Sequence, residues 1–446
     1  MRDTLRAQLW PLPTLGVVLA VAAGVGLPRL DARIQHDIPF WLKDYLFGGG
    51  AGAARTVLEA IAGSLISVTA LTFSLTVVTL QLASSQFSPR LLRMFTADRY
   101  VQTTLALFLA TFAYTLTVLR TVRTGDDGQV MFVPQLSVTV AFLLTLASVF
   151  GLVLFLSHLA REIRVETMMQ SVHSAADGTI HRLLSERAPA AGGPGVPPEP
   201  PADALPLPVP KPGFLTAVDE EALLEAAVEA GAVLLIDRRP GSSLITGTPL
   251  GAAWPLTGEP FSHETRTDLV RKAAEAVSTG TERTEAQDVA FGLRQLTDIT
   301  AKALSPGIND PTTAVHALSH SSALLCELAR RDLGPRVLHD DQHRVRVVLR
   351  RPDLADLLDL AVAQPLRYGA AEPLVLNRVA MLLRELAWNS APDRHPPIAA
   401  ALGRLRSTAA AQDFHATEHA RLDELVQQAE EALTGRWTYD RTDRTH

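Results

Sequence analysis

The sequence predicts an α-helical integral membrane domain of about four spans, followed by a mainly helical α+β cytoplasmic domain. The chain has 446 residues, of which 47% are hydrophobic and 20% charged. This composition is too apolar for a purely soluble protein and too charged for a purely membrane-embedded one. The long apolar runs lie before residue 160, whereas most charged residues follow it. We therefore expect a transmembrane domain at residues 1–160 and a soluble domain after it.

Four apolar runs are long enough to cross a bilayer, for which about 20 residues suffice. They occupy residues 9–27, 57–83, 101–119 and 136–159. The first follows Arg2 and Arg6, and we interpret it as a retained helix rather than a cleaved signal peptide because further apolar runs follow it. We expect this helix to stop at Pro28, since proline lacks the amide hydrogen that a helix needs.

The second run carries a polar stripe at helical spacing. Its members are Thr69, Thr72, Thr76, Thr79 and Gln86. In hydrocarbon, hydroxyl side chains turn toward protein or water, so the stripe faces either another helix or a wet path. Threonine hydroxyls also bond back to the carbonyl four residues earlier, which favours a packing seam. The sequence is compatible with both a packing seam and a wet path.

Basic residues near the spans predict the orientation. Ser88 and Pro89 start a short surface helix that places Arg90 and Arg93 at the membrane interface. The arginines of the four-span arrangement slightly favour both termini inside the cell. Cys326, the single cysteine, cannot form an internal disulfide, which fits a reducing cytosol. We therefore expect a multi-pass protein of the bacterial inner (plasma) membrane with a cytoplasmic C-terminal domain.

The chain after the fourth span divides by composition. Residues 161–187 continue the fourth span as an amphipathic helix. Residues 188–213 contain ten prolines and few large apolar side chains, which is typical of a flexible linker. Residues 256–436 show mainly helical periodicity, with one strand at Val345–Leu349. The polar residues 437–446 are expected to form a mobile tail.

Residues 214–255 predict a small αβ hairpin module. Asp219 caps a helix that Gly231 ends. Two short strands then surround an Arg-Pro-Gly turn, and a second turn follows near residues 246–249. The pattern is similar to half of a biotinyl or lipoyl carrier hairpin, but neither turn carries the lysine that carrier chemistry needs.

The most distinctive string of the soluble half is SPGINDP, between two predicted helices. Thr284 to Gln287 has capping-box spacing and is expected to open the first helix. Asp310 and Pro311 cap and start the second. The same turn could form a ligand-binding corner, whose candidate residues are Arg294, Asp298, Asn309 and Asp310. Arg294 and Asp298 are four residues apart, so an ordinary intrahelical ion pair explains them without a ligand.

No motif for catalysis, a metal or a cofactor emerges. The chain lacks a phosphate-binding glycine loop, an HExxH pair and a nucleophile elbow. His316 and His320 lie one helical turn apart, but no third ligand is placed beside them, so we predict no metal site. The formal net charge of -6 gives no basic footprint for nucleic acid.

Three stretches resemble a known bacterial family of predicted membrane proteins, domain of unknown function 2254. They are LTFSLTVVTLQLASSQFSPRLLRMF, FVPQLSVTVAFLLTLASV and ERTEAQDVAFGLRQLTDITAKALSPGINDPTTA. The resemblance covers nearly the whole chain, from about Leu9 to Leu433, and implies several membrane helices with a cytoplasmic domain. It implies no activity, substrate or catalytic residue.

Two hypotheses for function follow. In the first, copies of the chain form a homo-oligomeric channel for a small ion or solute, lined by the polar stripe of the second span. In the alternative, the chain is a membrane-anchored sensor or scaffold whose cytoplasmic domain binds a partner or a small ligand. In both, the lipid bilayer is the surrounding partner and no enzyme activity is predicted.

Overall fold

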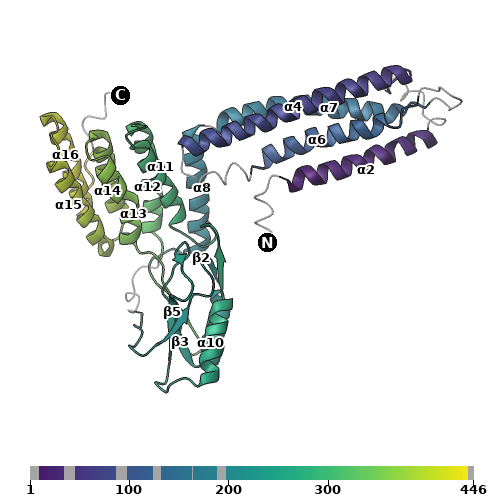
Figure 1. The fold of residues 1–446 in the computed structure, drawn as a ribbon. Helices are drawn as coiled ribbons and strands as arrows, with labels where there is room; N and C mark the ends of the chain where they lie inside the picture. The colour runs from purple at the N-terminus through teal and green to yellow at the C-terminus, as the bar shows by residue number, and fades with distance from the viewer. Residues whose placement is uncertain are drawn as a thin grey trace. The chain divides into compact units, whose positions relative to one another are not determined.

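The computed structural model describes residues 10–34, 46–86, 98–123, 132–162, 164–187 and 197–439, and for residues 82–86 and 162 it describes the backbone only. The chain divides into two compact units (Figure 1). We call Met1–Thr167 the N-terminal unit and Met168–His446 the C-terminal unit. Each unit is described by itself below.

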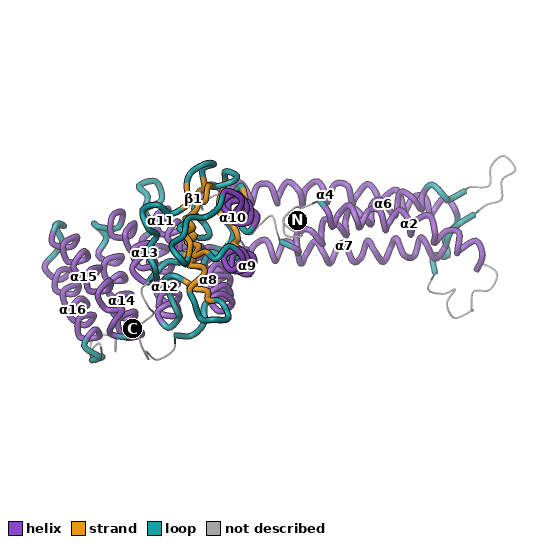
Figure 2. Tube along the Cα trace, turned by 90° about the horizontal axis from the view of Figure 1, so that it is seen from below, coloured by secondary structure: helices purple, strands orange, loops and turns teal. Residues whose placement is uncertain are grey.

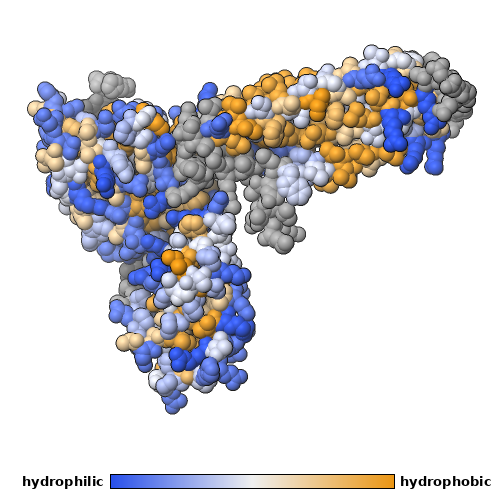
Figure 3. Space-filling view, viewed as in Figure 1, coloured by the Kyte–Doolittle hydropathy of each residue, from blue (hydrophilic) through white to orange (hydrophobic). Residues whose placement is uncertain are grey.

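The N-terminal unit contains four helices that are long and apolar enough to cross a membrane. They are α2 (Pro11–Ile34), α4 (Ala51–Gln86), α6 (Arg99–Leu119) and α7 (Gln135–Glu162). At about 1.5 Å per residue, even the shortest of them spans roughly 30 Å, the thickness of a bilayer's hydrocarbon core. The surface of this unit in Figure 3 is largely hydrophobic, as expected of helices that face lipid.

The central helix of this unit is α6, which packs against α2, α4 and α7 (Figures 1 and 2). The core between α2, α4, α6 and α7 includes the fully buried Leu58, Tyr114 and Val118. Large apolar side chains on α2, α4 and α7 also point outward, among them Leu19, Phe73 and Phe150. A bundle with apolar side chains both inside and outside suits a lipid environment rather than water.

The first helix differs from the expectation that it stops at Pro28. Helix α2 continues to Ile34 with Pro28 inside it. Proline costs a helix one hydrogen bond, a loss that packing against neighbouring helices offsets. The continuation places Asp31 in the helix, where its carboxylate is 5% exposed. Asp31 accepts hydrogen bonds from the backbone of Leu136 and Ser137, and therefore caps the start of α7.

Helix α8 (Val165–Leu183) starts three residues after α7 ends at Glu162, and all but its first three residues belong to the C-terminal unit. The single continuous helix predicted for residues 161–187 is therefore wrong at its start. Arg164, between the two helices, is outside either of them.

Two small sheets follow α8. Their strands are β1 (Leu205–Pro208), β2 (Gly213–Val218), β3 (Ala232–Ile236), β4 (Ser243–Leu244), β5 (Pro249–Pro255), β6 (Val277–Gly280), β7 (Arg336–His339) and β8 (Val345–Leu349). The first sheet has the order β1-β5-β3-β8-β7 and the second β4-β2-β6. All pairs are antiparallel except β3 with β8, which are parallel.

The pairing corrects the predicted module at residues 214–255. Strand β3 pairs with β5 and β8, whereas β4 pairs with β2 in the other sheet, so the two strands around the Arg-Pro-Gly turn do not pair with each other. The module is also not self-contained, because β7 and β8 come from the part predicted as mainly helical. Local turn residues indicate where strands end, but not which strands pair.

The predicted linker needs correction at its C-terminal end. Strand β1 lies within it and pairs with β5, and Leu207 and Val209 are buried in the core. Proline is tolerated here because β1 is the edge strand of its sheet. Residues 188–196 of the linker lie outside the described residues.

The remaining elements are helices. They are α9 (Glu220–Glu229), α10 (His263–Glu275), α11 (Phe291–Ala303), α12 (Pro311–Ala329), α13 (Leu354–Tyr368), α14 (Pro373–Asn389), the short 3-10 helix η2 (Pro392–Arg394), α15 (His395–Ala410) and α16 (Ala416–Leu433). Helices α11 to α16 form two layers (Figure 1). In one layer α11 contacts α13 and α13 contacts α15, and in the other α12 contacts α14 and α14 contacts α16. Their facing sides bury leucine, valine and alanine almost completely.

Helix caps confirm part of the local prediction. Asp219 caps α9, and Asp310 with Pro311 starts α12. The predicted capping box at residues 284–287 is wrong, because α11 starts only at Phe291 and no side chain caps it. Gln287 instead bonds to the backbone of Val218 on β2.

The predicted mobile tail begins too early at residue 437. The guanidinium of Arg384 lies 3.9 Å from the centre of the Trp437 ring, and Trp388 meets the same ring edge-on at 5.5 Å. A cation–π contact of this kind holds the segment against α14. Residues 440–446 lie outside the described residues.

Candidate functional site

The polar stripe of α4 is buried within the N-terminal unit. Thr69, Thr72, Thr76 and Thr79 are all less than 9% exposed, and Thr72 is fully buried. Each hydroxyl donates to the carbonyl four residues earlier, at 2.6 to 2.8 Å. The hydroxyls therefore already have their partners inside α4, as expected of a packing seam.

The apolar half of α4 shows the same burial on the same side. Ala54, Leu58, Ile61 and Leu65 precede the threonines at helical spacing and lie in the core with α6 and α7. The threonines thus continue a packed face toward the end of the helix. The side chain of Gln86 is outside the described residues, as are Arg90 and Arg93, so the predictions for these three stay predictions.

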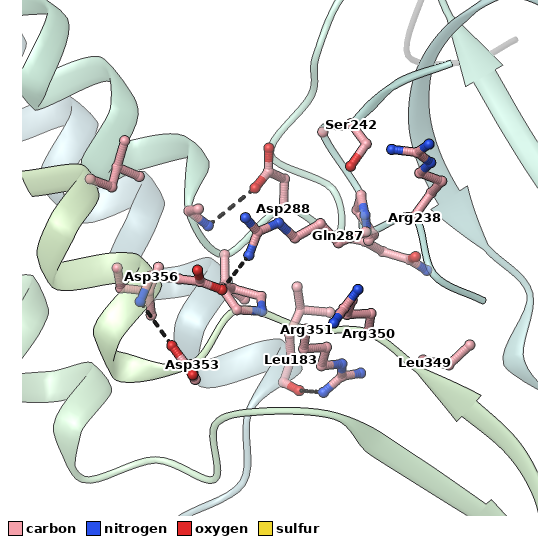
Figure 4. A pocket seen from close by; sticks show the side chains of 18 of the residues that line it. Leu183, Arg238, Ser242, Gln287, Asp288, Leu349, Arg350, Arg351, Asp353 and Asp356 are labelled. Atoms are coloured by element: carbon pink, nitrogen blue, oxygen red, sulfur yellow. Dashed lines mark hydrogen bonds and ion pairs between the residues drawn. The ribbon is translucent and has the colours of Figure 1, made fainter. Parts of the chain in front are cut away.

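A pocket of about 650 Å³ lies in the C-terminal unit. Typical small-molecule sites have volumes of about 300–1,000 Å³. Its walls come from the ends of β3 and β8, the segment before α11, and the first turns of α13. Figure 4 shows Arg238, Arg350 and Arg351 on the strand side, and Asp353 and Asp356 beside α13. The pocket is therefore assembled from segments more than 100 residues apart.

The position of the pocket in the sheet is typical of a ligand site. Strands β3 and β8 run parallel, and Ile236 pairs with Leu349 at their carboxyl ends. Shortly after each strand the chain has the same tripeptide, Arg-Arg-Pro, at residues 238–240 and 350–352. In sheets with parallel strands, ligands bind outside the carboxyl ends. The pairing of β3 with β8 brings the two Arg-Arg-Pro turns together at that edge.

Six arginines line the pocket. They are Arg238, Arg239, Arg283, Arg294, Arg350 and Arg351. Five carboxylates line it as well: Glu220, Asp288, Asp353, Asp356 and Asp359. The balance of charge therefore depends on which of these groups already neutralise each other.

Two of the arginines make ion pairs with pocket carboxylates on other elements. Arg239 pairs with Asp356 of α13 at 2.7 Å, and Arg351 pairs with Glu220 of α9 at 2.9 Å. Arg351 also donates to the carbonyl of Leu183. Burial lowers the pKa of Arg351, but the carboxylate of Glu220 opposes this effect. These two arginines hold the walls of the pocket together.

The third pair is buried behind the Arg-Pro-Gly turn. Asp288 is 4% exposed and accepts from Arg283 Nε at 3.0 Å and from the backbone of Ala290 at 3.1 Å. Burial raises the pKa of the Asp288 carboxyl, and the charge of Arg283 partly opposes the shift. Gly241 has φ +87°, and a Cβ there would lie 2.1 Å from Asp288 Oδ2. Only glycine fits this turn against the ion pair.

The first arginine of each Arg-Arg-Pro turn is more exposed. Arg238 bonds only weakly, from Nε to the carbonyl of Pro249 at 3.4 Å, and within the described part of the chain it makes no ion pair. Arg350 pairs with Asp237, but both side chains are well exposed, at 61% and 42%. Exposed pairs of this kind contribute little, about 0–1 kcal/mol. These two guanidinium groups can therefore turn toward a ligand at small cost.

Of the four residues predicted to form a ligand corner, only Arg294 lines the pocket. Asp310 caps α12 through Thr313, and Asn309 has φ +50° in the turn before it. Asp298, Asn309 and Asp310 are not among the lining residues. The other five arginines of the pocket were not predicted. The signal that identifies four of them is the repeated Arg-Arg-Pro after two apolar strands, whereas Arg283 lies outside both copies.

The histidines of α12 meet a third histidine from α8. The rings of His173 and His320 lie 5.2 Å apart, and His316 is one turn away on α12. The pKa of His320 is lowered mainly by burial and to a smaller extent by the neighbouring imidazoles of His173 and His316. Among the residues that the structure describes, no group of three metal-ligating side chains is arranged to hold a metal ion.

Comparison with known proteins covers both units. The model of a family described as "Predicted membrane protein (DUF2254)" matches residues 6–385. Uncharacterized proteins of Mycobacterium bovis and of Mycobacterium tuberculosis H37Rv are each 37% identical over 390 residues, which cover 87% of this chain and 73% of the relative. No solved structure matches the chain. The matched residues include the whole pocket.

Proposed function

The chain belongs to the family of predicted membrane proteins DUF2254, as its motifs predicted, and from that premise we propose that it is a membrane-anchored sensor. In this proposal α2, α4, α6 and α7 span the bilayer, and the C-terminal unit binds a small ligand in the arginine-lined pocket. The observation that carries the proposal is the pocket itself, at the carboxyl ends of the parallel strands β3 and β8.

Three features of the pocket support ligand binding. Its volume is that of a small-molecule site. It combines apolar walls, such as Ile236, Leu349 and Leu360, with several convergent charged groups. It also contains the buried carboxylate of Asp288, and carboxyl groups with a shifted pKa are more frequent at functional sites than elsewhere.

The alternative role, a conduit lined by the stripe of α4, has less support. Water-filled paths need polar groups that face the path, whereas Thr69, Thr72, Thr76 and Thr79 are buried within one copy of the chain. Their hydroxyls also donate to carbonyls of the same helix. The stripe therefore serves better as a seam between helices.

We place the protein in the bacterial inner membrane with its C-terminal unit in the cytoplasm. The arginines at the ends of the helices slightly favour this orientation, and the single Cys326 fits a reducing compartment. Fusions at the C-terminus test this. A green fluorescent protein fusion should fluoresce and an alkaline phosphatase fusion should be inactive, whereas the opposite pattern would place the unit outside.

The binding proposal is tested on the purified full-length chain in lipid nanodiscs. Ala355 lines the pocket and has no polar side chain, so Ala355→Trp should fill the pocket without breaking an ion pair. Ala399 is exposed on α15 and does not line this pocket, and Ala399→Trp is the matched control. Thermal shift against a metabolite library should yield a compound that stabilises wild type and Ala399→Trp but not Ala355→Trp.

Equal stabilisation of all three proteins would place the compound at another site. If no compound acts through the pocket, the sensor proposal fails, and the chain is better explained as a scaffold.

A further inference from the structure

We propose that the pocket of the C-terminal unit binds a phosphorylated small molecule, with the phosphate held by the two Arg-Arg-Pro turns. This inference rests on the proposed ligand-binding function and assigns the chemical class of the ligand. The observation that carries it is that Arg238 and Arg350, which follow the paired ends of the parallel strands β3 and β8, both line the same pocket.

The arginines of the turns divide into two roles. Arg239 and Arg351, the second of each turn, are tied to Asp356 and Glu220 and close the walls of the pocket. Arg238 and Arg350, the first of each turn, are exposed. A guanidinium presents up to five N–H donors in a planar fork that matches phosphate oxygens. Two such forks on the lining of one pocket can therefore donate to the oxygens of a single phosphate.

The start of α11 adds to the same electrostatic preference. Val289 and Ala290 line the pocket just before α11 begins at Phe291. The amide of Ala290 donates to the carboxylate of Asp288, whose charge Arg283 balances, so the positive charge that α11 adds to the pocket comes from its side chains. Arg294, one turn further along α11, also lines the pocket. Positive groups thus come from three separate segments of the chain.

Carboxylates on the opposite side orient the ligand. Asp353, Asp356 and Asp359 line the pocket on α13. Asp353 caps that helix, and Asp359 pairs with Arg404 of α15. Their negative charge repels a phosphate from the α13 side and suits hydroxyl or amino groups there. The phosphate end should therefore lie toward β3 and β8, and the rest of the ligand toward α13.

Phosphate fits this arrangement better than a carboxylate for a geometric reason. A carboxylate offers two oxygens in one plane, and a single arginine fork can satisfy both. A phosphate group offers three oxygens in a tetrahedral arrangement, which accept from donors that approach from different segments. Because the pocket is far larger than a phosphate ion and has apolar walls, the phosphate is one end of an organic molecule.

The test uses the full-length chain in nanodiscs and inorganic pyrophosphate as the probe, with citrate as a carboxylate probe of similar charge. Titration calorimetry should detect pyrophosphate, with citrate at least about tenfold weaker. Arg238→Gln/Arg350→Gln should weaken pyrophosphate binding by about tenfold or more, because two charge-assisted contacts are lost. Both side chains are exposed, so the melting temperature of this variant should match wild type.

The matched control is Arg406→Gln/Arg421→Gln, which removes the same charge from exposed pairs on α15 and α16. This control should bind pyrophosphate as wild type does. That result would show that the weaker binding of Arg238→Gln/Arg350→Gln is not caused by the change in net charge alone. Equal binding of citrate, equal binding by the Arg238→Gln/Arg350→Gln variant, or no pyrophosphate binding would each overturn the phosphate assignment.

The two proposals fail separately. A neutral or carboxylate compound that binds wild type but not Ala355→Trp would keep the sensor function and overturn the phosphate class. If neither pyrophosphate nor any library compound depends on the pocket, both proposals are overturned.

Discussion

The buried carboxylate of Asp31 should contribute strongly to the stability of the N-terminal unit. Asp31 Oδ1 accepts from the Leu136 amide at 3.1 Å. Asp31 Oδ2 accepts from the Ser137 amide at 2.9 Å and from its hydroxyl at 2.8 Å. These contacts join the end of α2 to the start of α7, two helices about 100 residues apart in the chain. The carboxylate also lies at the positive end of α7.

The magnitude follows from what each substitution leaves unpaired. Asp31→Ala removes every acceptor and leaves the buried amide of Ser137 and the partly buried amide of Leu136 without this partner. A lost cap costs about 0.5–2 kcal/mol. Hydrogen bonds to a charged group contribute about 1.5–3 kcal/mol each, although not additively. We therefore expect Asp31→Ala to lower the free energy of unfolding by about 3 kcal/mol. Asp31→Asn keeps one acceptor oxygen and should cost about 1–2 kcal/mol.

The assay is unfolding of the purified full-length chain by SDS titration in mixed micelles, with helix content as the readout. Glu59→Ala is the matched control, because Glu59 is an exposed acid of the same unit that pairs loosely with Arg55 at 3.5 Å. It should change the free energy of unfolding by less than about 0.5 kcal/mol. If Asp31→Ala were as stable as Glu59→Ala, the cap would not stabilise the bundle and the reasoning would be refuted.

Three further outcomes follow from the same contacts. Thr72→Val/Thr76→Val should leave both the folding of the chain and its ion flux in liposomes equal to wild type, because these hydroxyls are buried and bonded to their own helix. A changed ion flux would restore the conduit hypothesis. Burial raises the pKa of the Cys326 thiol to about 11, so labelling by maleimide at pH 8 should be roughly 100-fold slower in the native than in the denatured chain, and equal rates would show that the thiol is accessible. Burial raises the pKa of Asp288 above its usual 3.8, so the native state holds this proton more tightly and the contribution of Asp288 to stability falls as the pH rises above 3.8. The free energy of unfolding of Asp288→Asn minus that of wild type should therefore increase with pH over that range, and a constant difference would contradict the shift.

Features that depend on neighbouring residues could be predicted from the sequence. The four long helices follow from runs of apolar residues, since length and composition decide whether a segment suits a bilayer. The caps at Asp219 and Asp310 follow from side chains that reach their own backbone. Strand β8 was predicted with the bounds that the structure has, Val345–Leu349, because three of its five residues are valines, which are β-branched, and arginines flank it on both sides.

Features that depend on distant partners could not be predicted in the same way. The proline-rich segment becomes strand β1 only because β5 offers it a partner, and no property of residues 205–208 alone indicates this. Gln287 has the spacing of a capping box, but it bonds instead to β2, nearly 70 residues earlier. In each case a contact with a segment far away in the sequence replaces the structure that the local pattern predicts.

The pocket is the main feature that depends on distant partners. The two Arg-Arg-Pro tripeptides are 112 residues apart in the sequence and resemble ordinary polar turns when considered singly. The parallel register that pairs Ile236 with Leu349 makes them neighbours, and it places them at the carboxyl ends of the strands, outside which sheets of this kind bind ligands. A repeated tripeptide after two similar apolar strands is therefore stronger evidence of a shared site than either copy alone. For the polar stripe of α4 the sequence left a packing seam and a wet path open, and the burial of its threonines favours the seam that their own hydroxyls indicated.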